Sequence, residues 1–130
     1  MARVLVVDDE KTDRLLVQAI LARAGHKTVV AKGGEQALRE YLANGIDVVV
    51  TDLEMPDVHG FELITILREL SPPPSIVAVS AGGPFQLQMA EALGAGWTLP
   101  KPLDPELLLD AVERAYVYVQ ADEPERRLSG

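Results

Sequence analysis

The chain has 130 residues, of which 48% are hydrophobic and 25% are charged, and its formal net charge at pH 7 is −8. This length and composition predict one globular domain with a packed core, and they exclude a disordered chain and a second domain of similar size. The excess of negative charge opposes binding to a phosphate backbone, so we expect no direct contact with nucleic acid.

The chain contains no cysteine, which excludes a disulfide framework and a thiolate metal site. This composition agrees with a reducing compartment. No stretch approaches the roughly 18 consecutive apolar residues that a membrane span needs, and the first apolar run is too short for a signal peptide. We therefore expect a cytoplasmic protein that does not contact the membrane.

Short apolar runs alternate with segments of helical periodicity, a pattern typical of parallel β-α-β units. Strands are predicted at residues 3–7, 28–31, 47–51, 76–80 and 97–99. The third is nearly continuous in valine, as expected of a central strand that is covered on both faces. Helices are predicted after each strand, at about residues 15–24, 34–44, 61–67, 84–93 and 105–119.

The spacing of apolar residues predicts which helix faces are buried. The stripes contain Leu15, Leu16, Ala19, Ile20 and Ala24 in the first helix, Ala37, Leu38, Tyr41 and Leu42 in the second, and Leu107, Leu108, Ala111, Val112 and Ala115 in the last. Residues 120–130 are almost without apolar side chains. We therefore expect a domain at residues 1–119 and a polar tail or linker stub at residues 120–130.

Polar side chains follow four of the predicted strands. Asp8 and Asp9 follow the first strand, and Asp52 follows the third. Ser80 ends the fourth strand, and Lys101 follows the fifth. Ligands of open parallel sheets bind at the carboxyl ends of the strands. The sequence therefore predicts three carboxylates, a hydroxyl and an ammonium in one pocket.

This combination suits a metal-assisted phosphoryl-accepting site. Asp8 and Asp9 repel each other, and a divalent cation held by oxygen ligands, above all Mg²⁺, resolves that repulsion. Asp52 can act as the nucleophile that attacks phosphorus, and Lys101 can pair with Asp52 or with a phosphoryl oxygen. Taken singly, each residue has an ordinary alternative as a helix cap, a turn former or a solvated surface group.

Four segments of the chain, at residues 4–10, 52–60, 80–83 and 99–102, read VLVVDDE, DLEMPDVHG, SAGG and LPKP. In order and separation they resemble the motifs of the receiver domain of two-component response regulators. The resemblance covers about residues 2–119 of the chain. It implies a flavodoxin-like α/β fold, a three-layer sandwich whose five-stranded parallel sheet has the order 2-1-3-4-5 and is covered by five helices.

The resemblance also implies a role for each pocket residue. Asp52 is then the phosphoacceptor, and Asp8, Asp9 and Asp52 bind Mg²⁺, or Mn²⁺ in its place, together with the backbone carbonyl of Glu54. Ser80 is the switch hydroxyl that follows the phosphoryl group.

Lys101 is by resemblance the lysine that pairs with the phosphoryl group, and it precedes a cis peptide to Pro102. The implied protein is a phosphorelay signalling domain and not an enzyme, although it promotes its own phosphotransfer and dephosphorylation. A histidine kinase or phosphotransfer protein donates the phosphoryl group. An output protein, or an output domain missing from this chain, responds to a surface made by the last strand and the last two helices.

One position departs from the family pattern. Many receivers carry Tyr or Phe three residues before the lysine, whereas this chain has Thr98 there and Trp97 one place earlier. Alternation along a strand directs Trp97 to the opposite face. Thr98 and Trp97 therefore mark a switch region without the usual inward-swinging ring, and Trp97 either packs against a helix or anchors a partner.

Two other functions stay open. One is an interaction module with the same fold that is not phosphorylated. The other is an aspartate-nucleophile phosphatase of the haloacid-dehalogenase type, which is disfavoured because position 54 holds Glu54 where that family needs an aspartate. His26 and His59 lack a second histidine at ligand spacing, so we expect no metal at either.

Overall fold

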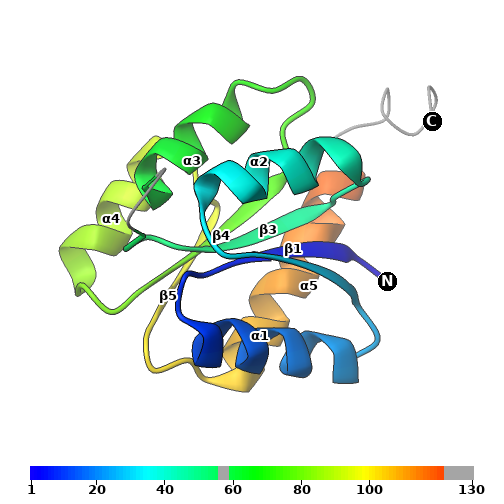
Figure 1. The fold of residues 1–130 in the computed structure, drawn as a ribbon, viewed down its shortest axis with the longest axis horizontal. Coiled ribbons are helices and arrows are strands. Elements are labelled where there is room, and N and C mark those ends of the chain that lie inside the picture. Colours follow the sequence, from blue (N-terminus) through cyan, green and yellow to red (C-terminus); the bar gives the residue numbers. More distant parts are fainter. Residues whose placement is uncertain (56–58, 122–130) are drawn as a thin grey trace.

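The computed structural model describes residues 1–55 and 59–121 as a three-layer α/β sandwich around a five-stranded sheet (Figure 1). All strand pairs are parallel, and the order is β2-β1-β3-β4-β5. The strands are β1 (Arg3–Val7), β2 (Lys27–Ala31), β3 (Val48–Asp52), β4 (Ser75–Ser80) and β5 (Trp97–Pro100). The predicted fold and strand order are confirmed.

Five helices connect or follow these strands. They are α1 (Lys11–Arg23), α2 (Gly34–Ala43), α3 (Gly60–Arg68), α4 (Pro84–Leu93) and α5 (Pro105–Ala121). In the described part of the chain, none of them combines the length and apolar character needed to cross a membrane. The predicted tail at residues 120–130 begins inside α5, and residues 122–130 lie outside the described residues.

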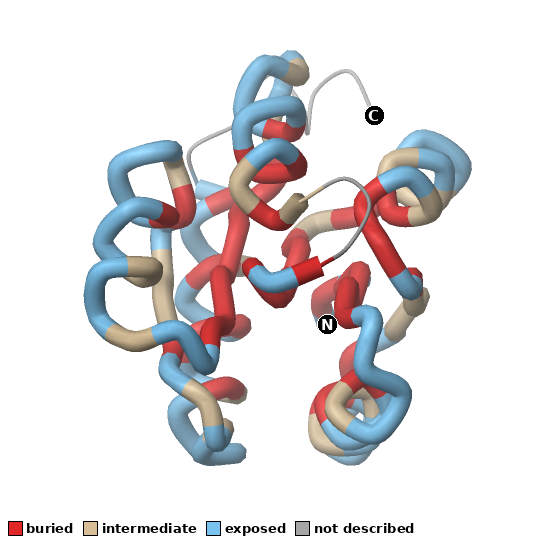
Figure 2. The backbone as a smooth tube through the Cα atoms, turned by 60° about the vertical axis from the view of Figure 1, so that its left-hand side comes forward, coloured by how far each residue is buried: buried red, intermediate tan, exposed pale blue. Residues whose placement is uncertain are grey.

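The core is divided by the sheet into two hydrophobic clusters. One cluster contains inward-facing side chains of α2, α3 and α4, and the other contains those of α1 and α5 (Figure 1). Every residue of β3 and β4 is buried, because helices cover both faces of these central strands. Figure 2 shows the buried stretches running through the sheet and along the inner sides of the helices. The strand ends are therefore fixed by a packed core.

The buried face of α1 differs from the predicted one. Leu15 and Leu16 are 48% and 50% exposed, whereas Arg14, Val17 and Leu21 are buried. The Arg14 guanidinium donates a hydrogen bond to the Asp8 carbonyl at 2.9 Å. The prediction was therefore wrong in the face that it chose: Val17 and Leu21 are apolar residues outside the predicted stripe, and a pattern that counts only apolar residues cannot include the buried Arg14.

Two further leucines of the predicted stripes are also exposed. Leu42 lies in the last turn of α2, and Leu107 lies in the first turn of α5. Both positions lie close to a helix end. The other predicted residues of these two stripes are buried or half-buried.

The backbone after β3 packs directly against the start of α3. The amide of Gly60 donates to the Leu53 carbonyl at 3.2 Å, and Leu53 is fully buried. A Cβ atom at Gly60 would lie 2.5 Å from the Asp52 carbonyl oxygen and 2.5 Å from the Leu53 Cα. Glycine at this position therefore allows the close approach that holds the end of β3.

We predict that Gly60→Ala destabilises the protein, because the new methyl group meets backbone atoms that cannot rotate away. The expected loss in the free energy of unfolding is about 1–3 kcal/mol, typical of overpacking. Gly45→Ala is the matched control, since no atom lies within 4 Å of a Cβ there, and it should change stability by less than about 0.5 kcal/mol. Urea denaturation compares them, and equal midpoints for the two variants would contradict this packing argument.

Candidate functional site

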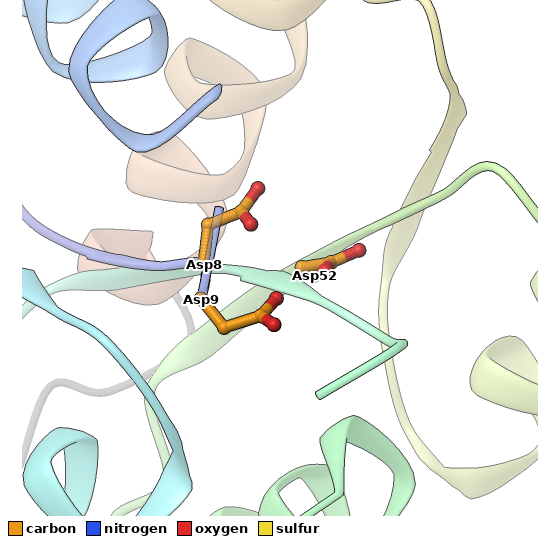
Figure 3. A group of neighbouring side chains, drawn as sticks. All are labelled: Asp8, Asp9 and Asp52. Atoms are coloured by element: carbon orange, nitrogen blue, oxygen red, sulfur yellow. The ribbon is translucent and has the colours of Figure 1, made fainter. Parts of the chain in front are cut away.

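Three aspartates meet at the carboxyl edge of the sheet. Asp8 and Asp9 follow β1, and Asp52 ends the neighbouring strand β3. One carboxylate oxygen of each lies within 4.8 Å of the others. Asp8 and Asp52 are buried, whereas Asp9 is exposed. Figure 3 shows the three side chains reaching in the same general direction from the two strand ends. The predicted gathering of these carboxylates is therefore observed.

Lys101 is the cation of this group. Its Nζ atom lies 3.1 Å from Asp8 Oδ2, 3.5 Å from Asp52 Oδ1 and 3.0 Å from Asp13 Oδ2. The Lys101 amide donates to the Ser80 carbonyl at 2.9 Å, which joins the end of β5 to the end of β4. The peptide bond between Lys101 and Pro102 is cis, as the resemblance implies.

Asp13 is a pocket residue that the sequence analysis missed. It lies in the first turn of α1 and makes the shortest of the three contacts to Lys101. The available signal was its position five residues after Asp8. If the helix begins within a few residues of the strand end, its first turn lies at the same edge of the sheet, and Asp13 lies in that turn. The prediction began the first helix near Leu15, so this signal was lost.

Ser80 is buried, and its hydroxyl is directed to Glu54. The Oγ atom donates to the Glu54 carboxylate, with distances of 2.8 Å and 3.0 Å to its two oxygens. The same Oγ accepts a hydrogen bond from the Gly82 amide at 2.9 Å, and the Ala81 amide donates to Glu54 Oε1 at 3.2 Å. The turn-capping alternative for Ser80 is thus present, and the Glu54 side chain has a partner that the sequence analysis did not assign.

Burial dominates the electrostatics of the aspartates. Burial raises the pKa of Asp52 from an ordinary value of 3.8 to about 6, and the Asp8 charge adds to this against the opposing charge of Lys101. Burial also raises the pKa of Asp8, opposed by the Glu10 amide and by Lys101. The pocket therefore disfavours its own negative charges.

The lysine shows the opposite balance. Burial alone would lower the pKa of Lys101, but its hydrogen bond to Asp13 and the nearby charges of Asp52 and Asp8 outweigh burial and raise it. Lys101 is therefore firmly protonated. One ammonium contacts three carboxylates, and Asp9 adds a fourth beside Asp8 and Asp52, so the pocket is short of positive charge.

The residues present fit a small hard cation. Asp52 Oδ1 is buried and accepts no hydrogen bond from the part of the chain that the structure describes. Carboxylate oxygens are the ligands that Mg²⁺ prefers, and the exposed Asp9 leaves a side open to water. The two histidines lie outside this acidic group: His26 Nδ1 accepts a hydrogen bond from the Ala2 amide, and His59 Nδ1 accepts one from the Phe61 amide.

The two switch-region residues lie on different sides of β5. Trp97 packs against the core beneath α5 and makes an edge contact with Tyr118, with ring centroids 5.9 Å apart. Thr98 is half-buried and is paired in register with Ala78. The helix-packing alternative for Trp97 therefore has a structural basis. Residues 56–58 of the predicted motif at 52–60 lie outside the described residues.

Comparison with known proteins agrees with this geometry. Residues 4–113 match the family described as the response regulator receiver domain. The chain is 39% identical over 100 residues to the autoinducer 1 sensor kinase/phosphatase LuxN of Vibrio campbellii, a match that covers 76% of this chain and 12% of the relative. It is 36% identical over 116 residues to the DNA-binding transcriptional regulator NtrC of Azospirillum brasilense, covering 88% and 24%.

A solved structure of similar size gives the same result. The Vibrio cholerae chemotaxis protein CheY4 superposes with a TM-score of 0.81 at 34% sequence identity. The match covers 88% of this chain and 98% of that one. In contrast, the chain spans much less than half the length of the two sequence relatives.

The raised pKa of Asp52 predicts how stability depends on pH when no divalent cation is present. Between about pH 4 and pH 6 the folded protein holds a proton that the unfolded chain has lost, so the parent loses stability as pH rises through this window. Asp52→Asn removes this loss and should be about 2 kcal/mol more stable than the parent at neutral pH.

Urea denaturation in a chelating buffer from about pH 4 to about pH 8 tests this linkage. The advantage of the Asn variant should grow with pH and should shrink when Mg²⁺ is added, because the cation stabilises the ionised carboxylates of the parent. A difference between variant and parent that stays constant over the whole range would contradict it.

Proposed function

The chain belongs to the family of response regulator receiver domains, signalling domains of two-component systems, and from this premise we propose that Asp52 accepts a phosphoryl group. The observation that supports the proposal most directly is the setting of Asp52. Its carboxylate is buried at a strand end, one oxygen accepts no hydrogen bond from the described residues, and Lys101 lies 3.5 Å away.

The donor that we propose is the phosphohistidine of a histidine kinase or phosphotransfer protein. An oxygen of Asp52 attacks the phosphorus atom, an O–P bond forms, and the N–P bond to the imidazole breaks as the imidazole takes up a proton. At neutral pH Asp52 is ionised, because its pKa of about 6 lies below the ambient pH. Lys101 donates hydrogen bonds to the phosphoryl oxygens and balances their charge.

We propose Mg²⁺ as the cofactor, with Mn²⁺ as a substitute. Asp8, Asp9 and Asp52 would hold the ion, together with the backbone carbonyl of Glu54. When bound, the ion supplies positive charge next to the oxygens of the transferred group. Asp9 would contribute a carboxylate that is already exposed, while Asp8 and Asp52 would contribute buried ones whose repulsion the ion would relieve.

A hollow beside the acceptor is suited to the phosphodonor. It has a volume of about 390 Å³, and its lining residues are Asp13, Leu16, Ala81, Lys101, Pro102 and Leu103. The mostly apolar wall and the exposed Leu16 of α1 can receive the apolar flank of a histidine-bearing helix. We propose that the donor docks here and that the reaction takes place in the cytoplasm.

We predict that a small-molecule phosphodonor and Mg²⁺ add one phosphoryl group to the parent, detected as a single mass increase of the intact protein. Asp52→Asn should abolish this labelling, because the amide nitrogen is a poor nucleophile. Asp110→Asn, a change of the same kind on the exposed face of α5, should leave it intact. Full labelling of the Asp52 variant would overturn the assignment.

Asp9→Asn should weaken Mg²⁺ binding more than Asp8→Asn, measured by calorimetric titration. Both oxygens of Asp8 already accept hydrogen bonds, one from the Glu10 amide at 2.9 Å and one from Lys101 at 3.1 Å. Asp9 is exposed and better placed to contact the ion directly. Equal losses would contradict this order, and no loss in either variant would contradict the metal site.

A further inference from the structure

The carboxylate of Glu54 accepts hydrogen bonds from the end of β4 and from the loop that follows it. Ser80 Oγ lies 2.8 Å and 3.0 Å from the two Glu54 carboxylate oxygens, and the Ala81 amide donates to Glu54 Oε1 at 3.2 Å. The Ser80 hydroxyl has a single proton to donate. As long as Glu54 accepts that proton, Ser80 cannot donate to an oxygen on Asp52.

We propose that Glu54 is a positioning residue that holds Ser80 in the unphosphorylated state and must release it before the hydroxyl can contact a phosphoryl group on Asp52. The proposal rests on Asp52 being the phosphoacceptor. It adds a side-chain role for Glu54 that is distinct from the backbone carbonyl offered to the metal ion. Phosphorylation then exchanges one acceptor of the Ser80 hydroxyl for another.

Charge and burial explain why the hydrogen bond between Ser80 and Glu54 can be broken. Glu54 is exposed, whereas Ser80 is almost fully buried, so the carboxylate can return to water when the hydroxyl leaves it. A bond from a hydroxyl to a carboxylate is stronger than one between neutral groups, so release needs a competing anion. A phosphoryl group on Asp52 supplies such an anion, and its charge also repels Glu54.

Ser80 is hydrogen-bonded to two neighbouring segments, one through its hydroxyl and one through its backbone carbonyl. The Gly82 amide, two residues before α4 begins, donates to Ser80 Oγ at 2.9 Å, and the Lys101 amide, directly after β5, donates to the Ser80 carbonyl at 2.9 Å. A Cβ at Gly82 would lie 3.2 Å from Ser80 Oγ. The loop before α4 is therefore packed around the hydroxyl, so a new position of the Ser80 hydroxyl requires the Gly82 amide to move with it or to lose this hydrogen bond.

The test is a double-mutant cycle on the affinity for beryllofluoride, a phosphoryl mimic, at saturating Mg²⁺. The four proteins are the parent, Glu54→Ala, Ser80→Ala and the double variant. Glu54→Ala should tighten beryllofluoride binding because Ser80 is already released, and the part of the gain that depends on Ser80 should be about fivefold, as expected for one hydrogen bond. In the Ser80→Ala background only the smaller effect of removing a charge should remain.

Two controls separate the contact from general charge effects. Glu62→Ala removes the same charge from the first turn of α3 and should leave affinity nearly unchanged. Glu54→Gln retains a neutral acceptor for the Ser80 hydroxyl and should fall between the parent and Glu54→Ala. In the unphosphorylated protein, hydrogen exchange of the Ala81 amide should accelerate in Glu54→Ala and not in Glu62→Ala.

The outcomes distinguish the two proposals. If the parent binds beryllofluoride and the gain from Glu54→Ala is the same with and without Ser80, the role of Glu54 is contradicted and the phosphoacceptor proposal is untouched. Weaker binding by Glu54→Ala also contradicts the role of Glu54. If no protein binds beryllofluoride, including the parent, the phosphoacceptor proposal fails, and the release step fails with it.

Discussion

The chain brings three carboxylates into contact with one half-buried ammonium and places a fourth beside them, and this imbalance of charge governs the carboxyl edge of the sheet. Lys101 contacts Asp8, Asp13 and Asp52, all within 3.5 Å, while Asp9 completes the acidic group. Repulsion of this kind at a partly buried site is unfavourable unless a carboxylate is protonated or a cation is added. Burial raises the pKa of Asp52 to about 6, and the charge of Asp8 adds to this effect.

The fold tolerates this repulsion at the edge of the sheet because hydrophobic packing away from the site stabilises the strands. β3 and β4 are buried at every residue, and the hydrophobic clusters on both faces of the sheet hold the strands in register. Gly60 lets α3 begin directly against the Asp52 carbonyl. The carboxylate therefore projects from backbone that cannot retreat to relieve the repulsion. We therefore expect a change of charge at Asp52 to rearrange side chains and loops rather than strands.

The sequence was sufficient for the parts of the site that follow from strand ends. Parallel strands place their carboxyl ends at one edge, so Asp8, Asp9, Asp52 and Lys101 could be brought together by counting strands alone. The missed features depend on where helices begin, how they rotate and which side chains pair. Helix α1 buries Val17 and Leu21 beside Arg14 instead of the predicted stripe, and the early start of α1 places Asp13 in the pocket. A hydrophobic pattern alone does not choose between two apolar stripes of one helix or fix the residue at which the helix begins.

The same distinction applies to the two donors that a phosphoryl group would need. Strand counting places Lys101 and Ser80 at the pocket, but their contacts show that both are engaged before any phosphoryl group arrives. Lys101 lies closer to Asp13 than to Asp52, and Ser80 donates to Glu54. An arriving phosphoryl group must therefore compete for donors that carboxylates already hold. Because Asp13 belongs to α1 and Glu54 lies in the loop after β3, that competition would connect the charge on Asp52 to this helix and to this loop.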